Sequence, residues 1–278
     1  MIKSYFLSAL FLGLVLNGFS QETPVSGPRT YQGRFYAYWG WNRAWFTDSD
    51  IHFQGKDYNF TLAQVQAKDR QTPISLDPYA NPVKITYPQT NFRFGYFFKN
   101  HWNVSFGTDH MKYVMVQNQV SHITGNIANS GTHYDGTYSN DTISLTKDFL
   151  SFEHTNGLNY VNFELRRFDQ LLDLNKYRLG KIEINLTEGL GAGGLYPKTN
   201  TKLLNYDRYD EFHVAGYGVD ALLGINICFW KYFFLQTELK GGYINMPDIR
   251  TTSIKDDKAS QHFFYTQVNF LLGGNFSF

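Results

Sequence analysis

Eight charged residues lie on one face of strand-like segments, where side chains of both signs would meet. They are Arg93, Asp109, Glu164, Arg166, Glu183, Asp220, Glu238 and Lys240. Their neighbours on that face are mainly Gly, Asn, Gln, Ser and Tyr. Such a set could form a salt-bridged plug or a narrow path for ions. Because charges held away from bulk water usually pair with each other, we favour the plug.

The histidines show no catalytic or metal-binding pattern. Asp109 and His110 are adjacent on a predicted strand, so their side chains point to opposite faces. The same holds for Glu153 and His154 if that segment is extended. The histidines in or near the predicted long loops are His52, His122, His133 and His262. None has the spacing of a metal-ligand set, so we expect no metal, no cofactor and no catalysis.

Composition excludes further classes of protein. Cys228 is the single cysteine, so there is no intramolecular disulfide. The chain has 25 Lys and Arg against 24 Asp and Glu, and without Lys3 the charges balance, which gives no electrostatic reason to bind nucleic acid. Aromatic residues make up 18% of the chain and there are 24 glycines, a mixture typical of strands and tight turns.

The N-terminus has the features of a secretory signal peptide. Lys3 precedes an apolar run, YFLSALFLGLVL, and NGFS supplies a small-residue ending before Gln21. The run is too short to anchor the chain in a membrane. We expect a signal peptide at 1–20 and one mature domain at 21–278.

Alternating apolar and polar residues predict the strands. In NFRFGYFF, residues 91–98, every second residue is aromatic. Glu188 interrupts the apolar face of its segment, with no reason apparent in the pattern. The alternating segments are 34–46, 91–98, 102–114, 158–168, 181–195, 211–227, 232–244 and 267–278.

Long and short connections alternate between these segments. The long ones are 47–90, 115–157, 196–210 and 245–260, and the short ones are 99–101, 169–180 and 228–231. This order predicts an all-β fold, an eight-stranded antiparallel up-and-down transmembrane β-barrel with long extracellular loops. Ten strands would follow if the hairpin near 51–62 entered the bilayer, which Lys56 and Asp57 argue against.

The apolar face is predicted to contact lipid. It is nearly free of charge along the middle of each strand, and a charge there at mid-bilayer would cost about 2–4 kcal/mol. A water-soluble barrel would instead turn this face inward and carry Lys, Glu and Ser outside. Aromatic residues near the short turns fit an interfacial girdle: Trp102, Tyr232, Phe233, Phe276 and Phe278.

The signal peptide, the eight strands and the final NFSF resemble the small outer-membrane barrel proteins of gram-negative bacteria, of the OmpA and OmpX type. The resemblance implies a place in the outer membrane, in contact with its lipid and lipopolysaccharide. In that family the barrel-assembly machinery reads a terminal Phe preceded by alternating apolar residues. The corresponding assembly signal here comprises Val268, Phe270, Phe276 and Phe278.

The two longest loops, 47–90 and 115–157, are the predicted contact sites for other envelope proteins or a polysaccharide, unless they only shield the rim. Residues 49–73 begin as a hairpin around Gly55 and continue as LAQVQAKDR, which could form a turn or two of helix. We expect a monomeric barrel with a structural, adhesive or accessory-subunit role. The alternatives are a narrow channel and a lipid-modifying outer-membrane enzyme.

Overall fold

The computed structural model describes residues 31–73, 75–79, 84, 88–154, 156–174 and 181–277. The predicted signal peptide and Phe278 therefore lie outside the described residues and stay predictions. Within these ranges no helix is both long enough and apolar enough to cross a membrane.

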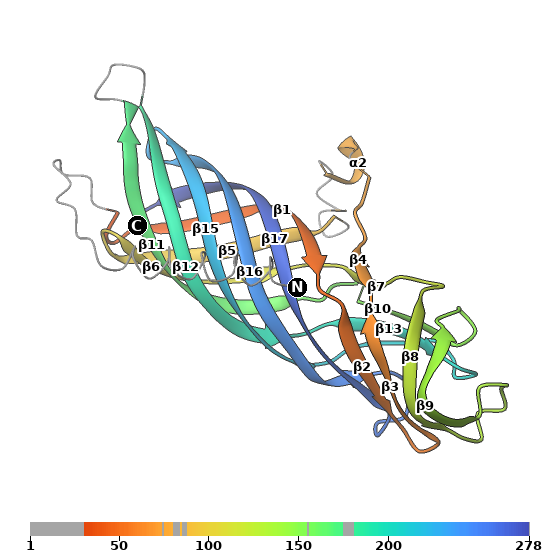
Figure 1. The fold of residues 1–278 in the computed structure, drawn as a ribbon. Coiled ribbons are helices and arrows are strands. Elements are labelled where there is room, and N and C mark those ends of the chain that lie inside the picture. The colour runs from red at the N-terminus through yellow and green to blue at the C-terminus, as the bar shows by residue number, and fades with distance from the viewer. Residues whose placement is uncertain are drawn as a thin grey trace.

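A ring of antiparallel strands forms the barrel (Figure 1). Its strands are β1 (Phe35–Phe46), β5 (Thr90–Lys99), β6 (Trp102–Asp109), β11 (Tyr160–Asp173), β12 (Ile182–Leu195), β15 (Gly216–Phe229), β16 (Phe233–Arg250) and β17 (Lys258–Phe276). Each strand pairs with the next, and β1 pairs with β17 as well as with β5, so the ring returns on itself. Within the described chain this confirms the eight-stranded barrel, and the hairpin near 51–62 is not part of it.

The two faces of the barrel wall follow the predicted alternation. Phe94 and Phe163 point outward and are 41% and 67% exposed, whereas Arg93 and Glu164 point inward and are 0% and 2% exposed. Val268 also lies on the outward face. The prediction that apolar residues face outward and polar residues fill the interior is therefore confirmed.

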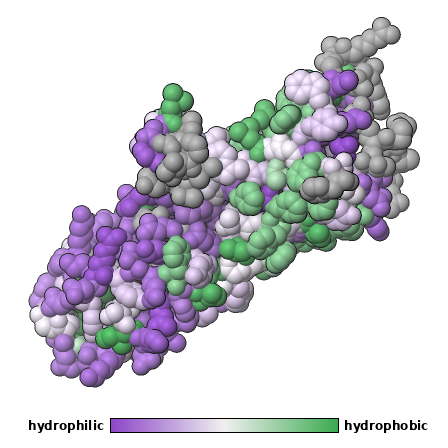
Figure 2. All heavy atoms as spheres, turned by 180° about the vertical axis from the view of Figure 1, so that it is seen from behind, coloured by the Kyte–Doolittle hydropathy of each residue, from purple (hydrophilic) through white to green (hydrophobic). Residues whose placement is uncertain are grey.

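Exposed aromatic residues lie at both ends of the barrel wall. Tyr232 and Phe233 are at the short-turn end, and Tyr217 and Phe264 are at the opposite end. Between them the outward face is mostly apolar, and Figure 2 shows hydrophobic residues over this half of the molecule and hydrophilic residues over the other. Two aromatic girdles that flank an apolar band are the signature of a barrel that spans a bilayer.

The predicted long loops fold into a second body, which we call the head. Strands β2 (Ser49–Gln54), β3 (Tyr58–Val65), β8 (Val120–Ile127) and β9 (Gly136–Ser144) continue the barrel sheet beyond β17. A second sheet contains β4 (Ala67–Asp69), β7 (Tyr113–Met115), β10 (Leu150–His154), β13 (Lys198–Leu203) and β14 (Tyr209–Phe212). The short helix α2 (Leu76–Tyr79) lies in the connection that follows β4.

The head has its own apolar core. Phe53 and Phe60 come from one sheet and Phe152 from the other, and all three are almost completely buried. The same cluster includes Phe263 of β17 and Tyr160 of β11, which belong to barrel strands. The head is therefore joined to the barrel through shared packing and through strands that run from one into the other.

Several predicted boundaries were wrong, and they share one cause. LAQVQAKDR forms the end of β3 and then β4 instead of a helix, and the predicted loop 245–260 shrinks to 251–257 because β16 and β17 run on past the membrane. The predicted strand 102–114 ends at Asp109. Outside the membrane, chain segments complete their hydrogen bonds by pairing with one another, and this tertiary pairing extends or interrupts strands regardless of local pattern.

Replacing Phe53 with Ala should unfold the head while the barrel remains folded. The cavity in the head core would cost about 3–5 kcal/mol, and the barrel wall does not depend on that side chain. Hydrogen exchange should show faster exchange in β2, β3 and β8, with β12 and β15 still protected. Val120→Ala removes an exposed side chain of the same sheet and should leave both regions as protected as in the native protein.

Candidate functional site

Arg166 of β11 binds two carboxylates in the middle of the barrel lumen. Its guanidinium nitrogens lie 2.5 Å from Glu164 Oε2 and 2.5 Å from Glu238 Oε1. All three side chains are almost completely buried. Arginine presents several donors in a fixed plane, so one guanidinium can hold carboxylates from β11 and β16 at once.

Lys240 and Arg93 complete the network. Lys240 Nζ lies 2.6 Å from both Asp109 Oδ2 and Glu164 Oε1. Arg93 Nη2 lies 2.8 Å from Glu164 Oε1 and 3.8 Å from Asp109 Oδ1. Glu164 therefore accepts contacts from three cations. Three cations and three carboxylates, drawn from β5, β6, β11 and β16, balance in charge away from water.

Neutral polar side chains satisfy the remaining donors and acceptors of the network. Tyr38 Oη accepts hydrogen bonds from Arg93 Nε at 3.0 Å and Arg166 Nη2 at 2.7 Å. Asn162 accepts one from Arg93 at 2.6 Å and donates one to Asp109 at 3.1 Å. Tyr38 and Asn162 lie on the polar faces of the predicted strands 34–46 and 158–168, but neither carries a charge that would mark it as part of the network.

Glu183 and Asp220 lie apart from the six-residue network. Glu183 Oε2 accepts a hydrogen bond from Tyr31 Oη at 2.8 Å, and Asp220 Oδ2 accepts one from Tyr160 Oη at 2.8 Å. The structure thus brings six of the eight predicted lumen charges into ion pairs and places the other two carboxylates beside tyrosines.

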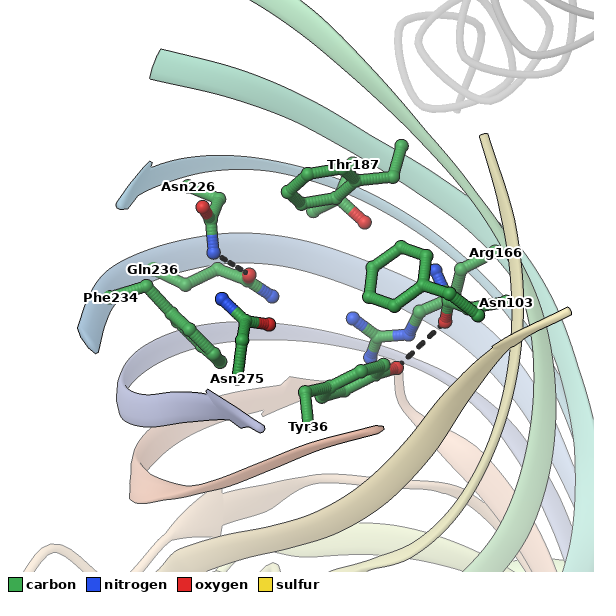
Figure 3. Close-up of a pocket in the computed structure, with 10 residues that line it drawn as sticks. Tyr36, Asn103, Arg166, Thr187, Asn226, Phe234, Gln236 and Asn275 are labelled. Carbon is green, nitrogen blue, oxygen red and sulfur yellow. Dashed lines mark hydrogen bonds between the residues drawn. The ribbon is translucent and has the colours of Figure 1, made fainter. Parts of the chain in front are cut away.

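Aromatic side chains fill the lumen between the network and the short turns. Tyr36, Phe97, Phe168 and Phe234 form a buried cluster with Tyr31. A cavity of about 10 Å³ remains beside them, lined by polar groups that include Asn226 and Gln236 (Figure 3). That volume holds about one water molecule, so little free space remains beside the aromatic cluster.

The histidines make pairs that the sequence did not reveal. His213 Nε2 lies 2.9 Å from Asp248 Oδ2, and His101 Nδ1 lies 2.9 Å from Asp169 Oδ1. Within the part of the chain that the structure describes, no hydroxyl or thiol bonds to either imidazole. Tertiary folding alone could reveal these pairs, because their members are far apart in sequence.

The adjacent pairs Asp109–His110 and Glu153–His154 remain separated, as strand geometry predicted. Asp109 binds Lys240, whereas His110 Nδ1 lies 2.8 Å from Asn159 Oδ1. His154 is fully buried in the head core, with Nδ1 2.9 Å from Thr199 Oγ1. Its burial lowers the pKa of His154 to about 3, so the imidazole is neutral.

Arg166→Met should destabilise the barrel by about 3–5 kcal/mol, because Glu238 would lose its ion-pair partner while remaining buried. Urea titration in lipid vesicles, followed by the mobility difference between folded and unfolded barrel on gels, measures this. Lys99→Met, which removes an exposed cation, should leave the transition in place. The double variant Arg166→Met/Glu238→Gln should recover part of the loss. Equal transitions for all variants would contradict the network's role.

The head should lose stability as the pH falls below about 6.5. The unfolded chain would protonate His154 near its ordinary pKa of 6.5, whereas the folded head resists protonation until about pH 3. Stability is complete above that window and decreases through it by up to about 1.4 kcal/mol per pH unit. Hydrogen exchange of β10 and β13 at pH 7.5 and 4.5 measures the change. His154→Gln should show a shallower pH dependence than the native head.

Known proteins resemble this chain in fold. No protein-family model and no curated protein sequence matches it. The solved structure of outer membrane protein AlkL in lipid bilayers is 8% identical, covers 93% of this chain and 97% of its own, and has a TM-score of 0.40. Ail, the attachment invasion locus protein of Yersinia pestis, is 10% identical over 88% of this chain and 99% of its own, with a TM-score of 0.31.

The outer membrane protease OmpT from Escherichia coli is 8% identical, covers 90% of this chain and 99% of its own, and has a TM-score of 0.36. These similarities concern fold alone, and the assignment depends on the closed ring, the apolar girdle and the polar lumen described above. On those features, the chain folds as an eight-stranded β-barrel whose outward face is suited to contact lipid.

Proposed function

We propose that this protein anchors a folded extracellular head in the outer membrane, and that the head binds a partner outside the cell or elsewhere in the envelope. The role is adhesive or that of an accessory subunit. The observation that carries this proposal is the head core, since Phe53, Phe60 and Phe152 are buried in a body built from segments that a simple barrel would need only as loops.

A folded head suits binding better than passive shielding does. A rigid scaffold that holds surface segments in fixed positions lowers the entropic cost of contacting a partner. Here β16 and β17 run from the barrel wall into the head, and the apolar cluster extends across the same junction. The head is therefore presented at a fixed place above the membrane instead of on mobile loops.

The lumen supports anchoring in preference to conduction. The ion pairs centred on Glu164 and the aromatic cluster around Tyr36 occupy the cross-section through which ions would pass. Moving an ion through this region would require separation of charges that stabilise each other.

The described residues also favour binding over catalysis. His213 and His101 are paired with carboxylates, but no nucleophile joins either pair. His154 does bond to a hydroxyl, that of Thr199, but both residues are buried in a closed core with no access for a substrate. The protein is proposed to have no enzymatic activity.

Cells that display the protein should adhere to immobilised polysaccharide or to neighbouring cells more than vector controls do. The head-unfolded variant Phe53→Ala is the matched comparison, because it retains the barrel wall and lumen. It should lose the added adhesion at equal surface amount, with barrel folding checked by gel mobility. Purified native protein should produce no conductance steps in a planar bilayer, and lipid A from expressing cells should have an unchanged mass.

Three results would contradict the proposal. Conductance steps from the native protein would support the narrow channel, and a mass change in lipid A that depends on expression would support the lipid-modifying enzyme. Adhesion that is the same with native protein and Phe53→Ala would show that the folded head is not what binds.

A further inference from the structure

The outward face of the barrel carries a cluster of charged side chains on neighbouring strands, and elsewhere Arg43 of β1 also faces outward, near the head end of its strand. We call the cluster the β11–β12 patch, and it comprises His101, Arg167, Asp169 and Glu188. Arg167 Nε lies 2.7 Å from Asp169 Oδ2, and His101 Nδ1 lies 2.9 Å from Asp169 Oδ1. Glu188 is paired with Arg167 across the two strands and is only 5% exposed.

Glu188 and Arg167 of the β11–β12 patch lie within the apolar band of the wall, whereas Asp169 and His101, a residue of the β5–β6 turn, lie toward its short-turn edge. On β12, Leu190 lies on one side of Glu188, and Ile184 and Leu186 lie on the other, all on the outward face. Glu188 is opposite Leu223, the middle of the outward row that runs from Tyr217 to Phe229 on β15.

The height of the patch follows from barrel geometry. Neighbouring strands are about 4.8 Å apart and tilt by about 40°, so paired residues on adjacent strands differ in height by about 3 Å. Glu188 therefore lies about 3 Å below the middle of the β15 row, and Arg167 about 6 Å below it. Both charges face outward at the depth of hydrocarbon, where ionisable side chains are costly and mark functional surfaces.

The orientation of outer-membrane proteins restricts what can cover this patch. Two copies insert in the same direction, so a two-fold axis that relates them must run parallel to the membrane normal. Residues at a given depth in the membrane on one wall then face residues at the same depth on the other wall. A patch of one sign would repel itself in that arrangement, whereas a patch that holds Arg167 beside Glu188 can pair with its own copy.

We propose that the β11–β12 patch is the centre of a symmetric dimer interface between two copies of this protein, with Arg167 of one copy shared between its own carboxylates and Glu188 of the partner subunit. Asp169 is held by His101 within each copy. Pairing across the axis removes the charges of Arg167 and Glu188 from contact with lipid. The proposed dimer takes the place of the monomer expected from the sequence.

The surface above the patch permits close approach of two walls. On β12 the outward residues after Leu190 are Ala192 and Gly194, and Ala221 of β15 lies opposite Leu190. A Cβ added at Gly194 would meet only one atom within 4 Å, the carbonyl oxygen of Gly216 at 3.9 Å, so the backbone is open to a neighbour there. Small side chains allow close backbone contact between membrane-embedded walls.

Disulfide crosslinking in native membranes tests the dimer. In a Cys228→Ser background, Leu165→Cys places a thiol on the outward face two residues from Arg167, and Trp39→Cys places one on β1, on the other side of the barrel. Oxidation should produce a product of twice the chain mass from Leu165→Cys and not from Trp39→Cys. Equal products from both positions, or none from Leu165→Cys, would overturn the proposal.

Charge variants in the Leu165→Cys background separate a specific interface from chance collision. The apolar pair Arg167→Met/Glu188→Met should keep a folded barrel and lose the crosslinked dimer. The exchanged pair Arg167→Glu/Glu188→Arg keeps both signs at the same height and should retain it. The proposed pairing of two copies would be overturned if the double variant Arg167→Met/Glu188→Met formed as much crosslinked dimer as the native charges do. It would also be overturned if the mass of the product showed that a different protein had been crosslinked. Gel mobility confirms barrel folding for every variant.

Discussion

Glu164 holds the barrel together from its centre, because it accepts contacts from Arg93, Arg166 and Lys240 at once. Lipid outside the wall forces every second residue to be apolar, and the alternate residues must then satisfy one another in a lumen too narrow for bulk water. As a consequence, charged side chains from strands that are distant in sequence pair with one another in the lumen. The network joins β5, β6, β11 and β16 across the lumen, so it fixes strands in register as well as filling space.

The same constraint explains why the head looks so different from the barrel. Beyond the apolar band the strands no longer contact hydrocarbon, and the two sheets of the head bury their apolar side chains against one another. Phe53, Phe60 and Phe152 therefore point into a core, whereas Phe94 and Phe163 in the barrel point outward. One chain thus uses aromatic residues in opposite ways, and the solvent around each half decides which.

The β11–β12 patch is where the outward face departs from this rule. Arg167 lies beside Glu188 across the two strands and is paired with Asp169, and a neighbour that offered the same charges would complete the arrangement. The charges of this patch are clustered on neighbouring strands, which distinguishes a contact surface from a generally polar wall. Anchoring, display and self-association are compatible with one another, since they use the wall, the head and one patch of the wall.

The alternation of residues determined the barrel by itself. In NFRFGYFF and its counterparts, a period of two names the lipid-facing and lumen-facing residues, and the alternation of long and short connections orders the strands in a ring. The eight lumen charges were identified for the same reason. Each lies on the polar face of a strand, and nothing beyond that local pattern was needed to place it inside.

Only the tertiary structure decided which of those charges meet and what the long segments become. Lys240 reaches Glu164 because barrel tilt and register bring distant strands to one height, and no sequence spacing encodes that distance. The polar strand β9, GTYSNDTIS, buries little besides Ile143 and exists because β8 offers it hydrogen-bonding partners. The local sequence pattern indicates whether a side chain faces lipid or the lumen. Which distant segments pair with each other depends on how the whole chain closes into a barrel.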